Sequence, residues 1–178
     1  ASLVFELLDK INSPKWNRVE INICPGLSAM QATAAKVGAP LGNDFCAISL
    51  SDLLTPWKEI YQRLKGAAIG DFVIALYNPV SKRRKKQIIE ARDLLLKFRS
   101  PKTPVVVGRN IGRVGETVTI MQLGDLKPES ADMLSLVLIG NSHTTILKRD
   151  QKQWVYTLRG YDAKMDRYEL VEFNKKDE

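Results

Sequence analysis

The chain has 178 residues, of which 44% are hydrophobic and 26% are charged. This balance is typical of a globular protein and excludes a disordered chain, which has too little apolar surface to form a core. No apolar run approaches the roughly 20 residues that cross a bilayer, so the sequence predicts no membrane-spanning segment, and we expect no membrane partner of that kind.

The net charge of +7 favours an anionic partner. Nucleic acid, an anionic membrane surface and a polycarboxylate or phosphate ligand all fit this charge. The two cysteines, Cys24 and Cys46, are too far apart in the sequence for a zinc pattern and too few for a disulfide framework. We therefore expect no metal site and a location in the reducing cytoplasm.

Residues 1–43 show the pattern helix, strand, helix and linker. Apolar residues at helical spacing predict a helix over 3–11, and alternation predicts a strand over 19–23. Ser28 is a helix N-cap, and Gly38 ends the helix that it starts. Because one strand cannot form a sheet alone, residues 1–43 are predicted to be the tail of an N-terminal α/β domain.

Residues 44–178 alternate between strand and helix signals, which is typical of an α/β domain. One helix begins at Pro56, and a second opens with the basic run 82–86 and turns apolar residues inward as far as Phe98. Strands are predicted over 44–50, 72–77, 104–107, 116–123, 133–139 and 154–158. The fold prediction is a C-terminal αβα domain with a mixed, largely parallel sheet.

Four loops that adjoin predicted strands carry glycine, polar or basic residues. They are 25–31, 76–79, 109–116 and 139–142. Open α/β sheets bind ligands beyond the carboxyl ends of their strands, so we expect these loops to meet in one cleft. The sequence contains no dinucleotide-binding glycine pattern and no Walker A motif.

The basic run 82–86 has two readings. It opens an amphipathic helix and has no interleaved aromatic residue to stack a base, which favours a solvated helix face. A non-catalytic nucleic-acid-binding module is the alternative.

The loop sequences resemble the tetrapyrrole (corrin or porphyrin) methyltransferases. The matching stretches are PGLSAMQATAAKVGAPLGNDFCAISLSDLLTPW (25–57), GDFVIALYNPVSKRR (70–84), TPVVVGRNIGRVGE (103–116), DMLSLVLIGNS (132–142) and WVYTLRGY (154–161). The segments SLSDLLTPW, LYNPVSKRR and GRNIGRVGE resemble most closely the subgroup that methylates carbon 17 of a precorrin and contracts its ring in cobalamin biosynthesis.

The resemblance implies an S-adenosylmethionine-dependent methyltransferase, with the cofactor held between two α/β domains. The residues that it assigns to cofactor binding are Ser28, Ala29, Tyr77, Asn110, Ile111, Gly140, Asn141 and Ser142.

The substrate that the resemblance implies is a tetrapyrrole rimmed with carboxylates, which gives the positive charge a purpose. Candidates for its binding are Ser49, Ser51, Thr55, Arg109 and Arg113, with Lys58 or Arg63 as further cations. Asp52 and Glu116 are candidates for the acid or base, and a helix cap or a solvent-paired carboxylate is the structural alternative for both. The family implies a homodimer and no nucleic-acid partner.

A glycine-rich acidic loop of the family, which contributes to its cofactor site, does not occur in this sequence. We therefore expect weak or no methyl transfer by this chain alone. A related methyltransferase that acts on RNA or protein remains the alternative within the same class.

Overall fold

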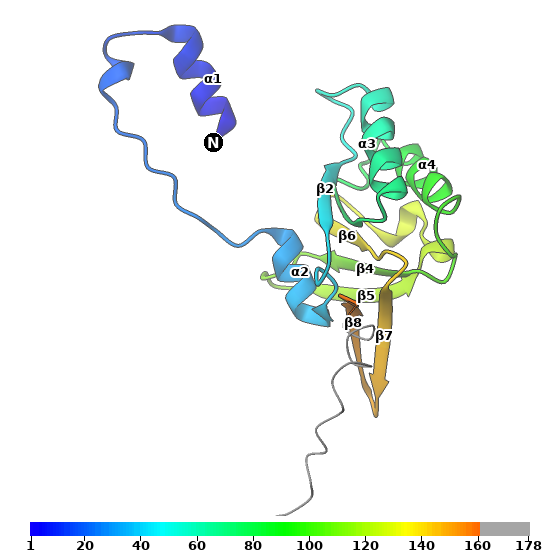
Figure 1. Cartoon of the computed structure of the whole chain (residues 1–178). Coiled ribbons are helices and arrows are strands. Elements are labelled where there is room, and N and C mark those ends of the chain that lie inside the picture. Colours follow the sequence, from blue (N-terminus) through cyan, green and yellow to red (C-terminus); the bar gives the residue numbers. More distant parts are fainter. Residues whose placement is uncertain (161–178) are drawn as a thin grey trace, which may run out of the picture.

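The computed structural model describes residues 1–160 (Figure 1). Its elements, in chain order, are α1 (Ser2–Ile11), η1 (Trp16–Arg18), α2 (Ala29–Val37), β1 (Gly38–Ala39), β2 (Phe45–Ser49), α3 (Trp57–Ile69), β3 (Val73–Tyr77), α4 (Lys86–Leu95), β4 (Pro104–Arg109), β5 (Thr117–Gln122), η2 (Leu123–Asp125), η3 (Pro128–Ser130), β6 (Ser135–Ile139), β7 (Thr144–Arg149) and β8 (Lys152–Thr157). Among these residues, no helix is both long and apolar enough to span a membrane.

A five-stranded sheet with the order β2-β3-β6-β4-β5 forms the centre of the fold. Strands β2 and β3 pair in parallel, whereas β6 is antiparallel to both β3 and β4, and β5 is antiparallel to β4. The prediction of a mixed sheet is confirmed, but the prediction of a largely parallel sheet is wrong. The reason is that β6 lies between β3 and β4 and runs in the opposite direction.

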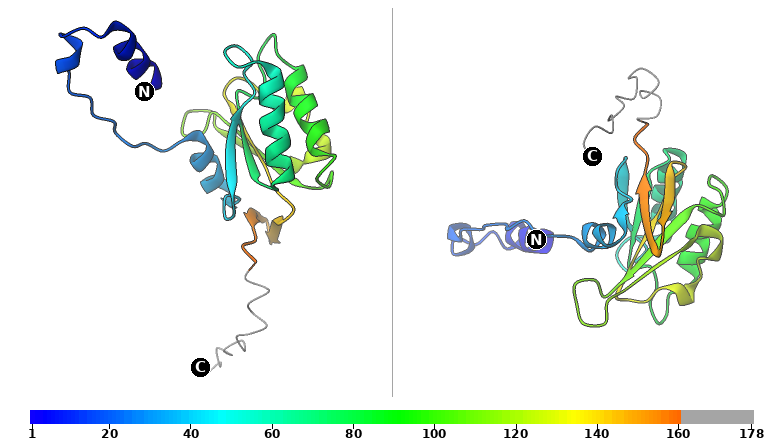
Figure 2. Two further views of the ribbon diagram at one scale, coloured as in Figure 1. Left: turned by 45° about the horizontal axis from the view of Figure 1, so that its top comes forward. Right: turned by 90° about the horizontal axis from the view of Figure 1, so that it is seen from below.

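Helices α3 and α4 cover one face of this sheet, as Figure 2 shows. In α3, Ile60 and Leu64 are one helical turn apart and both are fully buried. In α4, Ile88 and Leu95 are buried in the same cluster. The prediction that Phe98 points inward is wrong, because α4 ends at Leu95 and Phe98 is 46% exposed.

Helix α2 and a small sheet cover the other face. Ala34 and Val37 of α2 pack against Ala75, Leu138 and Val155 from three different strands. The small sheet has the order β1-β8-β7, so β8 is its central strand. Strand β7 was not predicted, but the two covered faces confirm the αβα arrangement.

The first 27 residues lie apart from the sheet in Figure 1. Helix α1 forms as predicted but buries none of its residues. The strand predicted over 19–23 is wrong, since no ladder forms there in the described residues and a strand needs a partner for its backbone groups. The domain boundary after residue 43 stays a prediction, and the packing of α2 on the sheet favours an earlier one.

Helix α2 approaches β4 closely because Gly108 has no side chain. A Cβ atom at Gly108 would lie 2.5 Å from Oγ1 and 2.6 Å from Cγ2 of Thr33, which is fully buried in α2. Glycine is therefore required at position 108 for the helix to lie at its present distance from the sheet.

We predict that Gly108→Ala lowers the free energy of unfolding by about 1–3 kcal/mol, because the added methyl group overpacks this contact. Urea titration measures the loss. Thr33→Ala in the same chain removes the two clashing atoms and should recover part of it. Gly66→Ala is the matched control, since a Cβ at Gly66 in α3 meets nothing within 4 Å. A loss as large at Gly66 as at Gly108 would contradict the packing argument.

Candidate functional site

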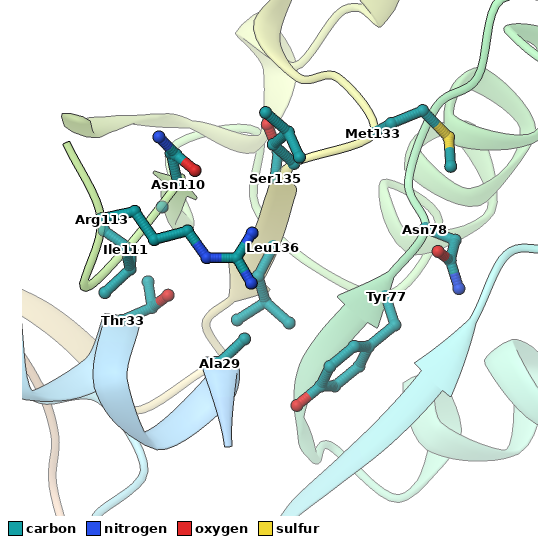
Figure 3. Close-up of a pocket in the computed structure, with 12 residues that line it drawn as sticks. Ala29, Thr33, Tyr77, Asn78, Asn110, Ile111, Arg113, Met133, Ser135 and Leu136 are labelled. Carbon is teal, nitrogen blue, oxygen red and sulfur yellow. The ribbon is translucent and has the colours of Figure 1, made fainter. Parts of the chain in front are cut away.

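A central cleft lies at the edge of the sheet where β3 and β4 end and β6 begins. Arg109, the last residue of β4, pairs with Ser135, the first residue of β6, so both strands open onto this edge. The amino end of α2 faces the same space (Figure 3). The cleft is lined by Ala29, Thr33, Tyr77, Asn78, Gly108, Asn110, Ile111, Arg113, Met133, Leu134, Ser135 and Leu136. Its volume of about 240 Å³ is below the ~300–1,000 Å³ of typical ligand pockets.

The start of α2 forms one wall of the central cleft. Ser28 caps the helix: its hydroxyl accepts a hydrogen bond from the Gln31 amide, and its own amide donates to the Gln31 side chain. The hydroxyl of Tyr77 accepts a hydrogen bond from the Met30 amide at 3.3 Å. The first amide of the helix, on Ala29, has no acceptor among the described residues. Ala29 and Tyr77 therefore line the cleft as expected, while Ser28 holds the helix end in place.

The loop after β4 forms the opposite wall. Asn110 has a positive φ of 53°, and its amide donates to the Leu134 carbonyl at 3.0 Å. Its side chain donates to the Val114 carbonyl at 2.6 Å. Asn110 therefore fixes the shape of the loop. Its backbone amide bonds to Leu134 within the protein and is not directed at a ligand. Ile111 and Arg113 line the cleft, and Arg113 makes no ion pair within residues 1–160.

Glu116 closes this loop. Its carboxylate lies 2.5 Å from Lys36 Nζ and accepts a hydrogen bond from the Gly112 amide at 2.9 Å. These hydrogen bonds hold the pKa of Glu116 below its ordinary value. Glu116 lies outside the cleft lining, and a carboxyl with a lowered pKa has no proton to donate near neutral pH. This geometry fits the structural alternative rather than the catalytic one.

Arg109 forms a second ion pair within the protein. Its Nε donates to Asp132 Oδ2 at 2.7 Å, and Asp132 also accepts from the Leu134 amide and the Ser135 hydroxyl. Burial opposes ionisation of Asp132, but these hydrogen bonds outweigh it and keep the pKa of the carboxyl below its ordinary value. Arg109 therefore positions the start of β6, and it does not line the cleft.

A second hollow, the serine groove, adjoins the central cleft at the end of β2. It brings together four predicted substrate residues, Ser49, Ser51, Thr55 and Arg63. Asn78 lines both hollows and donates from Nδ2 to the Ser49 hydroxyl at 3.1 Å. The floor and rim of the serine groove also include Ala47, Ile48, Leu53, Leu54 and Ile60.

Arg84 connects the loops that flank the serine groove. Its guanidinium donates to the Asn78 carbonyl at 2.6 Å and lies 3.9 Å from Asp52, which also accepts from Gln87 at 2.8 Å. Asp52 does not line the groove. Asp52 therefore holds a loop, and one residue of the basic run is used inside the protein.

Gly140, Asn141 and Ser142 lie at the opposite edge of the sheet, so the expectation that all four loops meet is wrong for the fourth. Asn141 is 3% exposed and donates to the Asp71 carbonyl, and the Ser142 amide donates to the Asp71 carboxylate at 3.1 Å. Because β6 is antiparallel, its beginning and not its end reaches the cleft. Met133, Ser135 and Leu136 therefore line the cleft and were not predicted, although they lie within the family-like stretch 132–142.

We predict that Asp132 contributes stability that acid removes. A carboxyl with a lowered pKa in the folded state stabilises the fold above the ordinary pKa of about 3.9, and this stability is lost as pH falls through the lower folded-state value. Asp132→Asn should therefore be less stable than the unaltered chain at neutral pH and should lose less stability below about pH 4. Urea unfolding across this range measures the effect.

Asp125→Asn is the control, because Asp125 is exposed and has no ion pair within residues 1–160. If the free energy of unfolding of Asp132→Asn falls with decreasing pH as steeply as that of the unaltered chain, Asp132 does not carry this dependence.

Comparison with known proteins places this fold among enzymes of one family. Residues 1–127 match the family described as Tetrapyrrole (Corrin/Porphyrin) Methylases. A precorrin-3B C(17)-methyltransferase from Sinorhizobium sp is 49% identical over 162 residues, which are 90% of this chain and 63% of that protein. A cobalt-factor III methyltransferase from Priestia megaterium is 43% identical over 92% of this chain and 30% of that protein.

A crystal structure of the methyltransferase CobJ matches with a TM-score of 0.79 and 42% identity, over 89% of this chain and 64% of that one. The chain thus spans less than two thirds of the length of these three proteins. The family match covers well over half of the chain, and the chain therefore belongs to the tetrapyrrole (corrin/porphyrin) methylases.

Proposed function

We propose that this chain is part of an S-adenosylmethionine-dependent enzyme that methylates carbon 17 of a corrin precursor, with ring contraction, in cobalamin biosynthesis. The observation that carries the proposal is the meeting of the family-like segments around Ala29, Tyr77 and Ile111 in one cleft. The Sinorhizobium and Priestia relatives carry the names of corrin-precursor methyltransferases. No described residue favours an RNA or protein substrate instead.

The central cleft fits one side of the cofactor. The Thr33 hydroxyl lines it, is fully buried and has no hydrogen-bond partner among the described residues. A buried polar group without a partner calls for an explanation, and an atom of a ligand or of a water molecule in the cleft would supply one. The free amide of Ala29 is a donor, and the Tyr77 ring is a face that suits an adenine or a sulfonium. When bound, the cofactor supplies an electrophilic methyl group, and these residues orient it and exclude water.

We propose that the serine groove holds the tetrapyrrole. Its hydroxyl groups and Arg63 are ligands for carboxylate arms, and the apolar rim of Leu53 and Leu54, which are 85% and 93% exposed, suits the face of a macrocycle. Arg113 extends into the central cleft from the other wall and ends beside Leu136 (Figure 3). Asn78 lies between donor and acceptor, so methyl transfer takes place beside it.

Weak or no methyl transfer by the isolated chain is part of the proposal. The volume of the central cleft, about 240 Å³ and below that of typical ligand pockets, supports it. We also propose a cytoplasmic homodimer. The free thiols of Cys24 and Cys46 support a reducing compartment. The β7–β8 hairpin, which projects from the sheet in Figure 1 and leaves Trp154 37% exposed, offers a surface for a second copy.

Titration calorimetry with S-adenosylhomocysteine tests the cofactor site. We predict that Tyr77→Ala weakens binding about tenfold, a loss of about 1.4 kcal/mol, because the ring face is removed. Tyr77→Phe should bind within about twofold of the unaltered protein, since it loses only the hydrogen bond to Met30. The titration is made with this chain and with a chimera that adds the remainder of the Sinorhizobium relative.

Tighter binding by the chimera than by the chain would support the proposed incomplete cleft. Binding by neither protein would refute the proposed function. Methyl transfer by the chimera to a corrin precursor is then measured with cobalt-containing and cobalt-free forms. The form that is methylated identifies the substrate.

A further inference from the structure

A third hollow, the lysine groove, lies between the loop after β3 and the segment before β6. Val80, Lys82, Lys85, Pro128, Met133 and Leu134 line it. Its floor is apolar, and its basic side comes from the run 82–86. Ser81, Ala131 and two carboxylates, Glu129 and Asp132, complete the lining, and Asp132 is already paired with Arg109.

The two lysines are held at this groove by a folded turn. The amide of Ser81 donates to the Arg84 carbonyl at 3.0 Å, and the Arg84 amide donates to the Ser81 hydroxyl at 3.1 Å. Arg84 points inward with its side chain 12% exposed. Lys82 and Lys85 flank it, are exposed, and make no ion pair within residues 1–160. The turn therefore buries one cation and leaves two available to a ligand.

The lysine groove adjoins the central cleft. Met133 and Leu134 line both hollows. The serine groove joins the same cleft through Asn78. A large flat ligand that lies over the central cleft can therefore reach both grooves at once.

We propose that Lys82 and Lys85 bind carboxylate arms of the tetrapyrrole substrate while the apolar floor contacts the edge of its ring. This inference rests on the proposed function and adds a second region of substrate contact to it. Two observations favour a polycarboxylate over a nucleic acid. The floor of the groove has no aromatic residue on which a base would stack. The groove also adjoins the cleft where a methyl donor is proposed to lie.

Fluorescence quenching with porphyrin probes tests the inference. The probes carry eight, four or two carboxylates, and the protein is this chain at low ionic strength. Lys82→Ala with Lys85→Ala should weaken binding of the eight-carboxylate porphyrin about tenfold and of the two-carboxylate porphyrin by less than about threefold. Added salt should reduce the difference between the probes.

The matched control is Arg83→Ala with Lys86→Ala. This variant removes the same charge from the same run, but at exposed residues that do not line the groove. We expect it to weaken binding by less than about threefold. Equal losses in the two double variants would overturn the inference, because they would reflect net charge and not a site.

The proposed function and this inference can fail separately. Retained S-adenosylhomocysteine binding with porphyrin binding that ignores Lys82 and Lys85 would refute only the lysine groove. Absence of any porphyrin binding by the unaltered chain would also refute the proposed substrate contact at the lysine groove. Preference of the groove for a single-stranded oligonucleotide over every porphyrin, lost in the Lys82/Lys85 variant, would overturn the inference in favour of a nucleic-acid site.

Discussion

The buried guanidinium of Arg99 joins the elements on which the site depends. It is 6% exposed and donates hydrogen bonds to the carbonyls of Gly140 and Phe72, each at 2.5 Å, and to that of Ala67 at 3.5 Å. Burial lowers the pKa of Arg99 and the nearby Asp71 carboxylate opposes this shift, so the cation is stabilised by acceptors on three separate segments. These contacts fix the end of β6 beside the start of β3. Because strands are stiff and their register is specific, fixing one edge of the sheet determines which residues meet at the other.

The sequence was sufficient for most elements of the domain, with β1 and β7 as exceptions, but not for all of the site. Local signals found α2, since Ser28 and Gln31 form a capping box that can be read from four consecutive residues. Apolar runs found β3, β4 and β6. The direction of β6 was not predicted, because a continuous apolar run is typical of parallel strands, whereas β6 is buried on both faces and pairs antiparallel to both of its neighbours. That one unknown explains why Gly140 to Ser142 were assigned to the cleft and why Ser135 and Leu136 were missed. The strand expected over 19–23 has the right alternation, but alternation does not supply a partner.

The positive charge of the chain is divided between internal and external uses. Lys36, Arg84, Arg99 and Arg109 each contact a carboxylate or a backbone carbonyl within the protein. Composition cannot separate these residues from cations that are free to bind a ligand, which is why Arg109 was predicted to bind the substrate although it pairs with Asp132. The pattern of partners leaves Arg113 at the central cleft and Lys82 and Lys85 at the lysine groove, while Arg63 at the serine groove forms an exposed pair with Glu59. The surface that suits an anionic ligand is therefore much smaller than the net charge of +7 suggests.

Tyr77 and Asn78 are neighbours in the chain, and they separate the place proposed for the donor from the place proposed for the acceptor. Their Cα atoms are joined by one trans peptide, a distance of about 3.8 Å that cannot stretch. A substitution that shifts β3 would move both walls together and leave their spacing unchanged. A change in the shape of the acceptor, by contrast, has to be met by the loop 51–55, which is attached to β2 and not to the donor wall. In the proposed enzyme, this arrangement would let the acceptor site change shape through one loop while its distance from the donor wall stays constant.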